Sequence, residues 1–192
     1  MKTEPPQSKL RIIAGRLRGR KLVFVPVPGL RPTPDRVRET LFNWLTPVIR
    51  GARCLDLFAG SGVLGFEAAS RGAASVVLVD NNTTVTRLLR EQAVMLGTTG
   101  VQVVTADAFI YMQGAHEPFD IVFLDPPYRE ALLGECMRQL ETGHWLAAEA
   151  WIYIEAEQTI RLDSLLPDNW ELYRSKVAGQ VGYHLVRRTT PA

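Results

Sequence analysis

The spacing of apolar residues predicts alternating strands and helices from residue 53 onward. Short, nearly continuous apolar runs are typical of strands buried on both faces of a parallel sheet. Helical repeats of apolar residues, over 62–72, 84–97 and 130–141, separate most of these runs. The runs are RCLDLFA (53–59), SVVLVD (75–80), VQVVTAD (101–107), FDIVFLD (119–125) and AWIYIEAE (150–157). The pattern predicts an α/β protein with a doubly wound sheet.

Both ends of the chain depart from this rhythm. Residues 169–188 form two alternating apolar and polar runs about a turn at Ala178–Gly179, so we expect the sheet to finish with an antiparallel hairpin. Residues 10–26 predict a second hairpin around AGRLRG. A helix should follow, with Thr33 as N-cap and Pro34 at its first position. We expect a disordered segment 1–9, a hairpin and helix over 10–50, and a main domain over 51–192.

Charge is distributed unevenly along the 192 residues. The net charge is +2, but residues 1–50 hold 11 Lys/Arg against 3 Asp/Glu. A basic arm on an acidic body indicates a polyanionic partner, and a solubilising tail is the alternative. Such a hairpin can lie on the sheet and direct its arginines at phosphates, although each arginine taken singly is better explained as a surface charge. The candidates are Arg11, Arg16, Arg18, Arg20 and Lys21, with Arg31, Arg36 and Arg38 bordering a pocket.

Other features of the composition argue against a membrane protein, a secreted protein and a metalloprotein. No apolar run is long enough to span a membrane, and MKTEPPQSKL does not resemble a signal peptide, so we expect a cytoplasmic protein. Cys54 and Cys136 lack CxxC spacing, and the three histidines are scattered, so we predict no metal site. The sequence has no additional amphipathic segment that would indicate an oligomer, so we expect a monomer.

A glycine loop follows the strand at 53–59. Gly60-x-Gly62-x-x-Gly65 opens a helix, and Asp80 ends the next strand 20 residues later. This spacing matches the dinucleotide fingerprint and, taken alone, is compatible with an NAD site. Glycines that serve only a tight turn and close packing are the weaker alternative.

Two features argue against NAD: an acid, Asp56, inside the first strand, and the DPPY sequence that ends the fourth. Both suit S-adenosylmethionine, which carries an ammonium group and a ribose but no pyrophosphate. Asp56 can hold the amino group, Asp80 the ribose hydroxyls and Asp107 the adenine amine, although a lone strand-end Asp more often caps a helix. The candidate cofactor residues are Asp56, Phe58, Ala59, Gly60, Ser61, Gly62, Asp80, Asn81, Asp107 and Ala108.

The sequence Asp125-Pro126-Pro127-Tyr128 interrupts a buried strand with groups suited to an aromatic amine. Such an amine is a poor nucleophile because its lone pair is delocalised into the ring. The Asp125 carboxylate and the Pro126 carbonyl can accept its N–H bonds, which favours tetrahedral geometry and stabilises the developing positive charge. The tyrosine ring can stack on the base, a contact worth about 1–3 kcal/mol. A proline-rich surface loop is the alternative.

The motifs together resemble a known family. CLDLFAGSGVLGFEAASRGA and FDIVFLDPPY resemble class I Rossmann-like methyltransferases that modify exocyclic amines. RIIAGRLRGRKL and RPTPDRVRETLFNWL narrow the resemblance to the RsmD family of bacterial 16S ribosomal RNA guanine-N2 methyltransferases. The likeness runs from about Leu10 to Arg188, although similar proteins often carry Glu at position 80 and Asn at position 92.

This resemblance implies a seven-stranded sheet, S-adenosylmethionine as donor and S-adenosylhomocysteine as product. It implies 16S rRNA as partner, within a small ribosomal subunit or an assembly intermediate, and Asp125, Pro126, Pro127 and Tyr128 as the catalytic loop. Three alternatives remain open: a DNA adenine-N6 methyltransferase, a catalytically silent RNA-binding assembly factor, and an enzyme acting on protein amides, whose loop usually begins with Asn.

Overall fold

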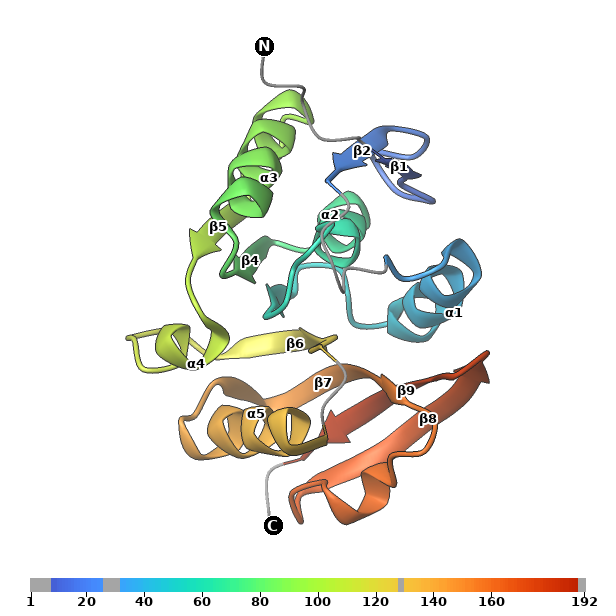
Figure 1. Cartoon of the computed structure of the whole chain (residues 1–192), viewed down its shortest axis with the longest axis vertical. Coiled ribbons are helices and arrows are strands. Elements are labelled where there is room, and N and C mark those ends of the chain that lie inside the picture. Colours follow the sequence, from blue (N-terminus) through green and yellow to red (C-terminus); the bar gives the residue numbers. More distant parts are fainter. Residues whose placement is uncertain (1–7, 26–31, 128–129, 190–192) are drawn as a thin grey trace.

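Seven strands form the central sheet of the computed structural model, which describes residues 8–25, 32–127 and 130–189. The strands are β3 (Arg53–Asp56), β4 (Ser75–Asp80), β5 (Val101–Thr105), β6 (Phe119–Leu124), β7 (Leu146–Glu157), β8 (Trp170–Ala178) and β9 (Val181–Arg188). Their order is β5-β4-β3-β6-β7-β9-β8, and only β9 runs antiparallel to its neighbours β7 and β8. The predicted mostly parallel sheet with an antiparallel C-terminal hairpin is confirmed (Figure 1).

Helices cover both faces of this sheet. They are α1 (Asp35–Leu45), α2 (Val63–Ser70), α3 (Thr83–Met95), α4 (Ala108–Tyr111) and α5 (Glu130–Thr142), with a 3-10 turn at Leu162–Ser164. Alternate strand residues point to opposite faces. Accordingly, Phe123 packs in one core cluster with residues of α1, α2 and α3, and Val122 packs in another with residues of α4 and α5. The sheet is therefore doubly wound, as predicted.

The N-terminal hairpin, β1 (Ser8–Arg11) with β2 (Lys21–Phe24), packs against helices and not on the sheet, contrary to the prediction. The backbone amides of Ile13 and Ala14 donate to the Glu67 carboxylate of α2 at 2.9 and 3.1 Å. The Val23 amide donates to Gln92 of α3 at 2.7 Å. Ile12 and Leu22 of the hairpin and Leu41 of α1 share one hydrophobic core cluster with residues of the sheet.

Arg38 corrects a prediction about the arm. Its side chain is fully buried, donates to the carbonyls of Thr33 and Arg11, and lies 3.6 Å from the Glu67 carboxylate. A buried charge must be paired, and Arg38 meets that need inside the protein. It therefore joins the hairpin, α1 and α2, and is not available for contact with an RNA phosphate.

Two predictions about the chain's start are also wrong. Ser8 and Lys9 lie in β1 and are not disordered, while residues 1–7 lie outside the described part of the chain. Thr33 does not cap α1, because that helix begins at Asp35 and has no side-chain cap. The Thr33 hydroxyl donates instead to Glu155 on β7 at 2.6 Å. No helix among the described residues is long and apolar enough to cross a membrane.

Candidate active site

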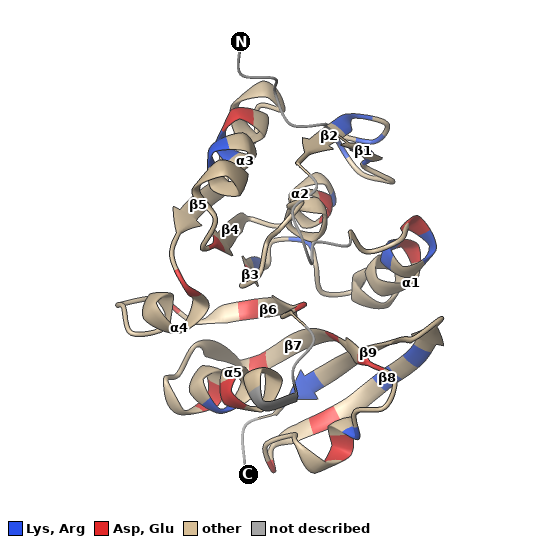
Figure 2. Cartoon of the chain, in the orientation of Figure 1, with Lys and Arg blue, Asp and Glu red and all other residues tan. Residues whose placement is uncertain are grey.

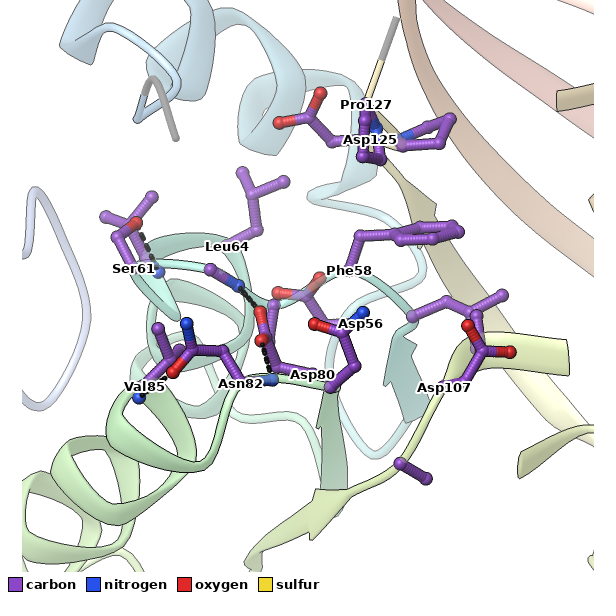
Figure 3. A pocket seen from close by; sticks show the side chains of 18 of the residues that line it. Asp56, Phe58, Ser61, Leu64, Asp80, Asn82, Val85, Asp107, Asp125 and Pro127 are labelled. Atoms are coloured by element: carbon purple, nitrogen blue, oxygen red, sulfur yellow. Dashed lines mark hydrogen bonds between the residues drawn. The ribbon is translucent and has the colours of Figure 1, made fainter. Parts of the chain in front are cut away.

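A cavity of about 580 Å³ lies at the carboxyl ends of β3, β4 and β6, where open α/β sheets bind their ligands. Figure 3 shows Asp125 and Pro127 across this cavity from Asp80 and Asn82. The predicted site residues that line it are Asp56, Phe58, Ala59, Gly60, Ser61, Asp80, Asn81, Asp107, Ala108, Asp125, Pro126 and Pro127. Residues more than 60 positions apart in sequence thus meet at one place.

The glycine loop shapes this cavity without every glycine lining it. Gly62 is not among the lining residues, so its predicted contact with the cofactor is not observed. It precedes α2 with φ at 72°, and a Cβ there would lie 2.5 Å from the side chain of Leu89. A Cβ on Gly65 would lie 2.1 Å from Leu78. These two glycines allow the turn and the close packing of α2 on the sheet.

Asp80 fastens the loop to the end of β4. One carboxylate oxygen accepts the Gly60 amide at 2.9 Å, and the other accepts the Asn82 amide at 2.8 Å. An ionised carboxylate offers about four lone-pair sites, so acceptor capacity remains on the cavity side for the predicted hydroxyl contacts.

Asp107 has a comparable backbone role at the end of β5. Its Oδ1 accepts the amides of Phe109 and Ile110 at 2.8 and 3.3 Å and caps α4. The side chain is exposed and also lines the cavity. The helix-cap alternative is therefore observed, while the predicted contact with an adenine amine stays a prediction.

Asp56 differs, because it is buried within the sheet. It is 2% exposed, and its Oδ2 accepts a weak hydrogen bond, 3.3 Å long, from the Gly65 amide, while the Phe58 amide also lowers its pKa. Burial is the main cause that raises its pKa to about 7, and the nearby carboxyls of Asp80 and Glu155 add to the effect. A cation placed beside this carboxyl would stabilise its ionised form.

Asp125 follows β6 and has a similar electrostatic environment. Its pKa is raised well above the usual value, first by burial and then by the carboxyls of Glu155 and Asp56. No hydrogen bond to its carboxylate comes from the part of the chain that the structure describes, and Asp125 lines the cavity. Tyr128, the last residue of the predicted loop, lies outside the described residues.

Glu155 is a residue that the sequence analysis missed. It is 5% exposed, and its Oε1 accepts hydroxyl hydrogen bonds from Thr33 at 2.6 Å and Tyr153 at 2.9 Å. Thr33 and Pro32 themselves line the cavity, so the segment before α1 forms part of the wall. An acid within the apolar run AWIYIEAE was the available signal, the same signal that pointed to Asp56.

The cavity carries a strongly acidic charge. Four aspartates line it, and its described lining residues include neither lysine nor arginine. Buried carboxyls without internal cations favour a positively charged ligand. The observed charge therefore fits a cofactor with an ammonium group and does not fit a pyrophosphate.

The members of the predicted basic set that the structure describes do not line this cavity. Arg16 and Arg20 direct their guanidinium groups at the carbonyls of Gly97 and Met95, just beyond and at the end of α3. Arg31 lies outside the described residues. The exposed members of the predicted set are Arg11, Arg16, Arg18, Arg20, Lys21 and Arg36.

Comparison with known proteins shows the family of this chain. The family model described as "Conserved hypothetical protein 95" matches residues 10–187. Ribosomal RNA small subunit methyltransferase D of Escherichia coli K12 is 50% identical over 180 residues, which is 94% of this chain and 90% of the relative. The solved Escherichia coli protein yhhF is 49% identical with a TM-score of 0.86, covering 96% of this chain and all of that one.

A more distant structure supports the fold alone. The Thermus thermophilus 16S rRNA N2 methyltransferase RsmC, solved with AdoMet and guanosine, is 19% identical with a TM-score of 0.68. This chain is covered to 97% and that chain to 50%. The family model matches nearly the whole chain, and the sequence is half identical to the Escherichia coli methyltransferase D. The chain therefore belongs to the RsmD family of methyltransferases.

Proposed function

We propose that this protein methylates the exocyclic N2 amine of a guanine in 16S ribosomal RNA, with S-adenosylmethionine as donor. The observation that carries the proposal is that Asp125, Pro126 and Pro127 line the same acidic cavity as the glycine loop. The residues proposed to bind the cationic donor, next to the glycine loop, thus lie across the cavity from the residues proposed to bind the substrate amine. We further propose that the protein acts in the cytoplasm as a monomer, on a small subunit or an assembly intermediate.

The residues present fit the donor. Asp56 is buried, has no cationic partner among the described residues and suits an ammonium group, and Asp80 has acceptor sites left for ribose hydroxyls. A cavity of about 580 Å³ has the size of a typical cofactor site. When bound, the donor supplies a methyl group activated by a positively charged sulfur.

The catalytic loop acts on the substrate amine. The Asp125 carboxylate and the Pro126 carbonyl are acceptors for its two N–H bonds, and accepting them draws the nitrogen toward tetrahedral geometry. When the donor is bound, the nitrogen would gain a bond to the methyl carbon as the bond from that carbon to the donor sulfur breaks, leaving the neutral thioether S-adenosylhomocysteine. The nitrogen would then carry the positive charge, which the nearby Asp125 carboxylate stabilises. It then loses one proton, for which Asp125 is the acceptor. No covalent enzyme intermediate is needed, because positioning and charge stabilisation suffice.

The choice of RNA over DNA rests on the curated relatives, whose names specify the small-subunit rRNA, and on the exposed basic residues of the N-terminal hairpin. The guanine N2 position rests on the family resemblance. The amide alternative is less suited, because its loop usually begins with Asn where this chain has Asp125.

Transfer of a labelled methyl group tests the proposal. Unmodified small subunits, their naked 16S RNA and double-stranded DNA are each incubated with labelled donor and digested to nucleosides. We expect label in N2-methylguanosine, from wild type and not from Asp125→Asn. Label confined to N6-methyladenine of DNA, or no label in RNA from a protein that binds donor, would contradict the proposal.

A further inference from the structure

Aromatic rings and basic side chains alternate across the C-terminal strands, on the face of the sheet that α1 covers. The Trp44 ring of α1 stacks on Tyr183 with 5.7 Å between centroids, and the Lys176 ammonium lies 5.9 Å from the Trp44 ring. We call this surface the aromatic–cation face. Its residues are Trp44, Trp151, Tyr173, Arg174, Lys176, Tyr183 and Arg187.

A second set of contacts continues the face along β8 and β9. Trp151 meets Tyr173 edge to face at 5.0 Å between centroids, and the guanidinium of Arg174 lies 4.6 Å from the Tyr173 ring. Arg187 lies 5.8 Å from the Trp151 ring but pairs with Glu149 at 3.0 Å. Among the described residues, Arg174 and Lys176 have no such carboxylate partner. Their charges are therefore free to meet an anion.

The face is accessible at its outer edge. Tyr173 is 45% exposed, and Arg174 and Lys176 are exposed beside it on β8, the edge strand. Basic residues on an edge strand also discourage pairing with another chain. That role explains the charges but not an exposed tyrosine held between a tryptophan and an arginine.

The sheet register connects this face to the catalytic loop. Asp125 follows Leu124, which pairs with Ile154, so Asp125 is level with Glu155. Glu155 pairs with Tyr183, and Tyr183 pairs with Lys176. These four side chains lie in one row on the same face, because they alternate in step with Phe123 and Tyr153 of the α1-side core. Three strand spacings, about 14 Å, separate the strand of Asp125 from that of Lys176.

We propose that the aromatic–cation face is a second RNA-contacting surface, across which the strand leading to the target base lies. This inference rests on the proposed function, namely that the substrate is RNA. Arg174 and Lys176 supply charges for phosphates, and such contacts position a strand without reading its sequence. The exposed Tyr173 ring offers a stacking platform for an unpaired base.

The position of the face supports this role. Figure 2 shows basic residues on the β1–β2 hairpin and also on the β8–β9 pair, at separate places on the molecule. The cavity itself is acidic and would repel phosphates. Two basic surfaces outside an acidic cavity would hold the RNA backbone away from it and admit the base alone.

The test uses the full-length protein with Arg174→Gln and Lys176→Gln combined, and separately Tyr173→Ala. Arg138→Glu is the matched control, since it changes the net charge equally and lies exposed on α5, which packs on the opposite face. For the double variant we expect the KM for unmodified 16S RNA to rise about tenfold, and the slope of log affinity against log salt to fall by about 1.4. For Tyr173→Ala we expect a raised KM with an unchanged salt slope.

Two controls separate the possible failures. Donor affinity by calorimetry should match wild type in all variants, because none of the substituted side chains lines the cavity. Melting temperature is measured in parallel, since Tyr173→Ala loses its contact with Trp151 and Arg138→Glu loses its ion pair with Glu135. If the double variant behaves as Arg138→Glu does, while wild type methylates RNA, the second surface is overturned and the proposed function stands. If wild type neither binds nor methylates RNA, both proposals are overturned.

Discussion

The four aspartates of the cavity fall into two pairs that do different work. Asp80 and Asp107 accept backbone amides and hold the glycine loop and α4 in place. Asp56 receives only weak backbone hydrogen bonds from the described residues and Asp125 receives none from them, and both have raised pKa values. An aspartate at a strand end thus has a structural role where nearby backbone amides need an acceptor. Where they do not, its carboxylate can interact with a charged ligand.

Loss of solvation explains why the second pair differs. It is the first cause that raises the pKa of both Asp56 and Asp125, although only Asp56 is fully buried, and weak backbone hydrogen bonds to Asp56 do not replace the lost water. Asp56, Asp125 and Glu155 also repel one another, because each raises the pKa of a neighbour. The free protein therefore holds protons here that a cationic ligand would displace, which couples donor binding to ionisation.

The largest effect expected is at Asp125. Asp125→Asn keeps the shape and loses the charged acceptor, so we expect kcat to fall at least about a hundredfold at saturating donor. Donor affinity, measured by calorimetry, should change little. Asp107→Asn is the control and should retain turnover, since amide oxygen can still cap α4. If the Asp125 variant turns over as fast as wild type, the proposed difference in role between Asp125 and the structural aspartates Asp80 and Asp107 is wrong.

The next effect concerns pH and donor affinity. The folded pKa of Asp56 is about 7, well above its ordinary value of 3.8, so the carboxyl is protonated below pH 7 and ionised above it. An ammonium group binds the ionised form, so donor affinity should rise by up to about tenfold per pH unit up to 7 and then level off. Calorimetry from pH 5 to 9 checks this, and Asp56→Asn should flatten the profile.

The same shift predicts a change in stability without ligand. Because the folded state of Asp56 holds its proton more tightly than the unfolded state does, stability is greatest below the unfolded pKa and falls as pH rises through about 7. Urea unfolding at pH 5 and pH 8 measures the difference. Asp56→Asn should lose this part of the pH dependence, and a variant that keeps it would show that another group is responsible.

A smaller effect is expected at Glu155. Glu155→Gln can still accept the Thr33 and Tyr153 hydroxyls but removes a charge that raises the pKa of Asp125. The acidic limb of kcat/KM for RNA should therefore move to lower pH. Glu157→Gln makes the same change at an exposed position two residues along β7. If both variants shift the acidic limb of the pH profile equally, the burial of Glu155 beside Asp125 does not explain the effect.

The smallest effect is structural, at Asp107. Asp107→Ala removes the acceptor that caps α4, at a cost of about 1 kcal/mol. A domain of this size should then melt about 2–4 °C lower. Differential scanning calorimetry of the Ala and Asn variants measures this, and an equal loss in both would show that the carboxylate charge matters and the hydrogen bond does not.

Much of the fold and the site was predictable, for a physical reason. Hydrophobic periodicity specifies strands and helices locally, and parallel topology brings strand ends to one edge, so Asp56, Asp80, Asp107 and Asp125 were expected to meet. Thr33 and Arg38 were not predictable, since their local signals, a helix cap and an exposed turn of helix, were overridden by partners 122 and 29 residues away. A helix-start motif carries no information about a distant buried carboxylate.

The element order, the doubly wound sheet with its antiparallel end, and the residue types at the strand ends follow from patterns within a few residues, so they could be inferred from the amino-acid sequence. Which aspartates accept backbone amides and which are left for a ligand became clear from the folded structure alone. The folded structure also decided that the basic hairpin lies on α2 and α3, and that Glu155 stands beside Asp125. Burial and pairing depend on neighbours brought together from across the chain, and local sequence does not specify them.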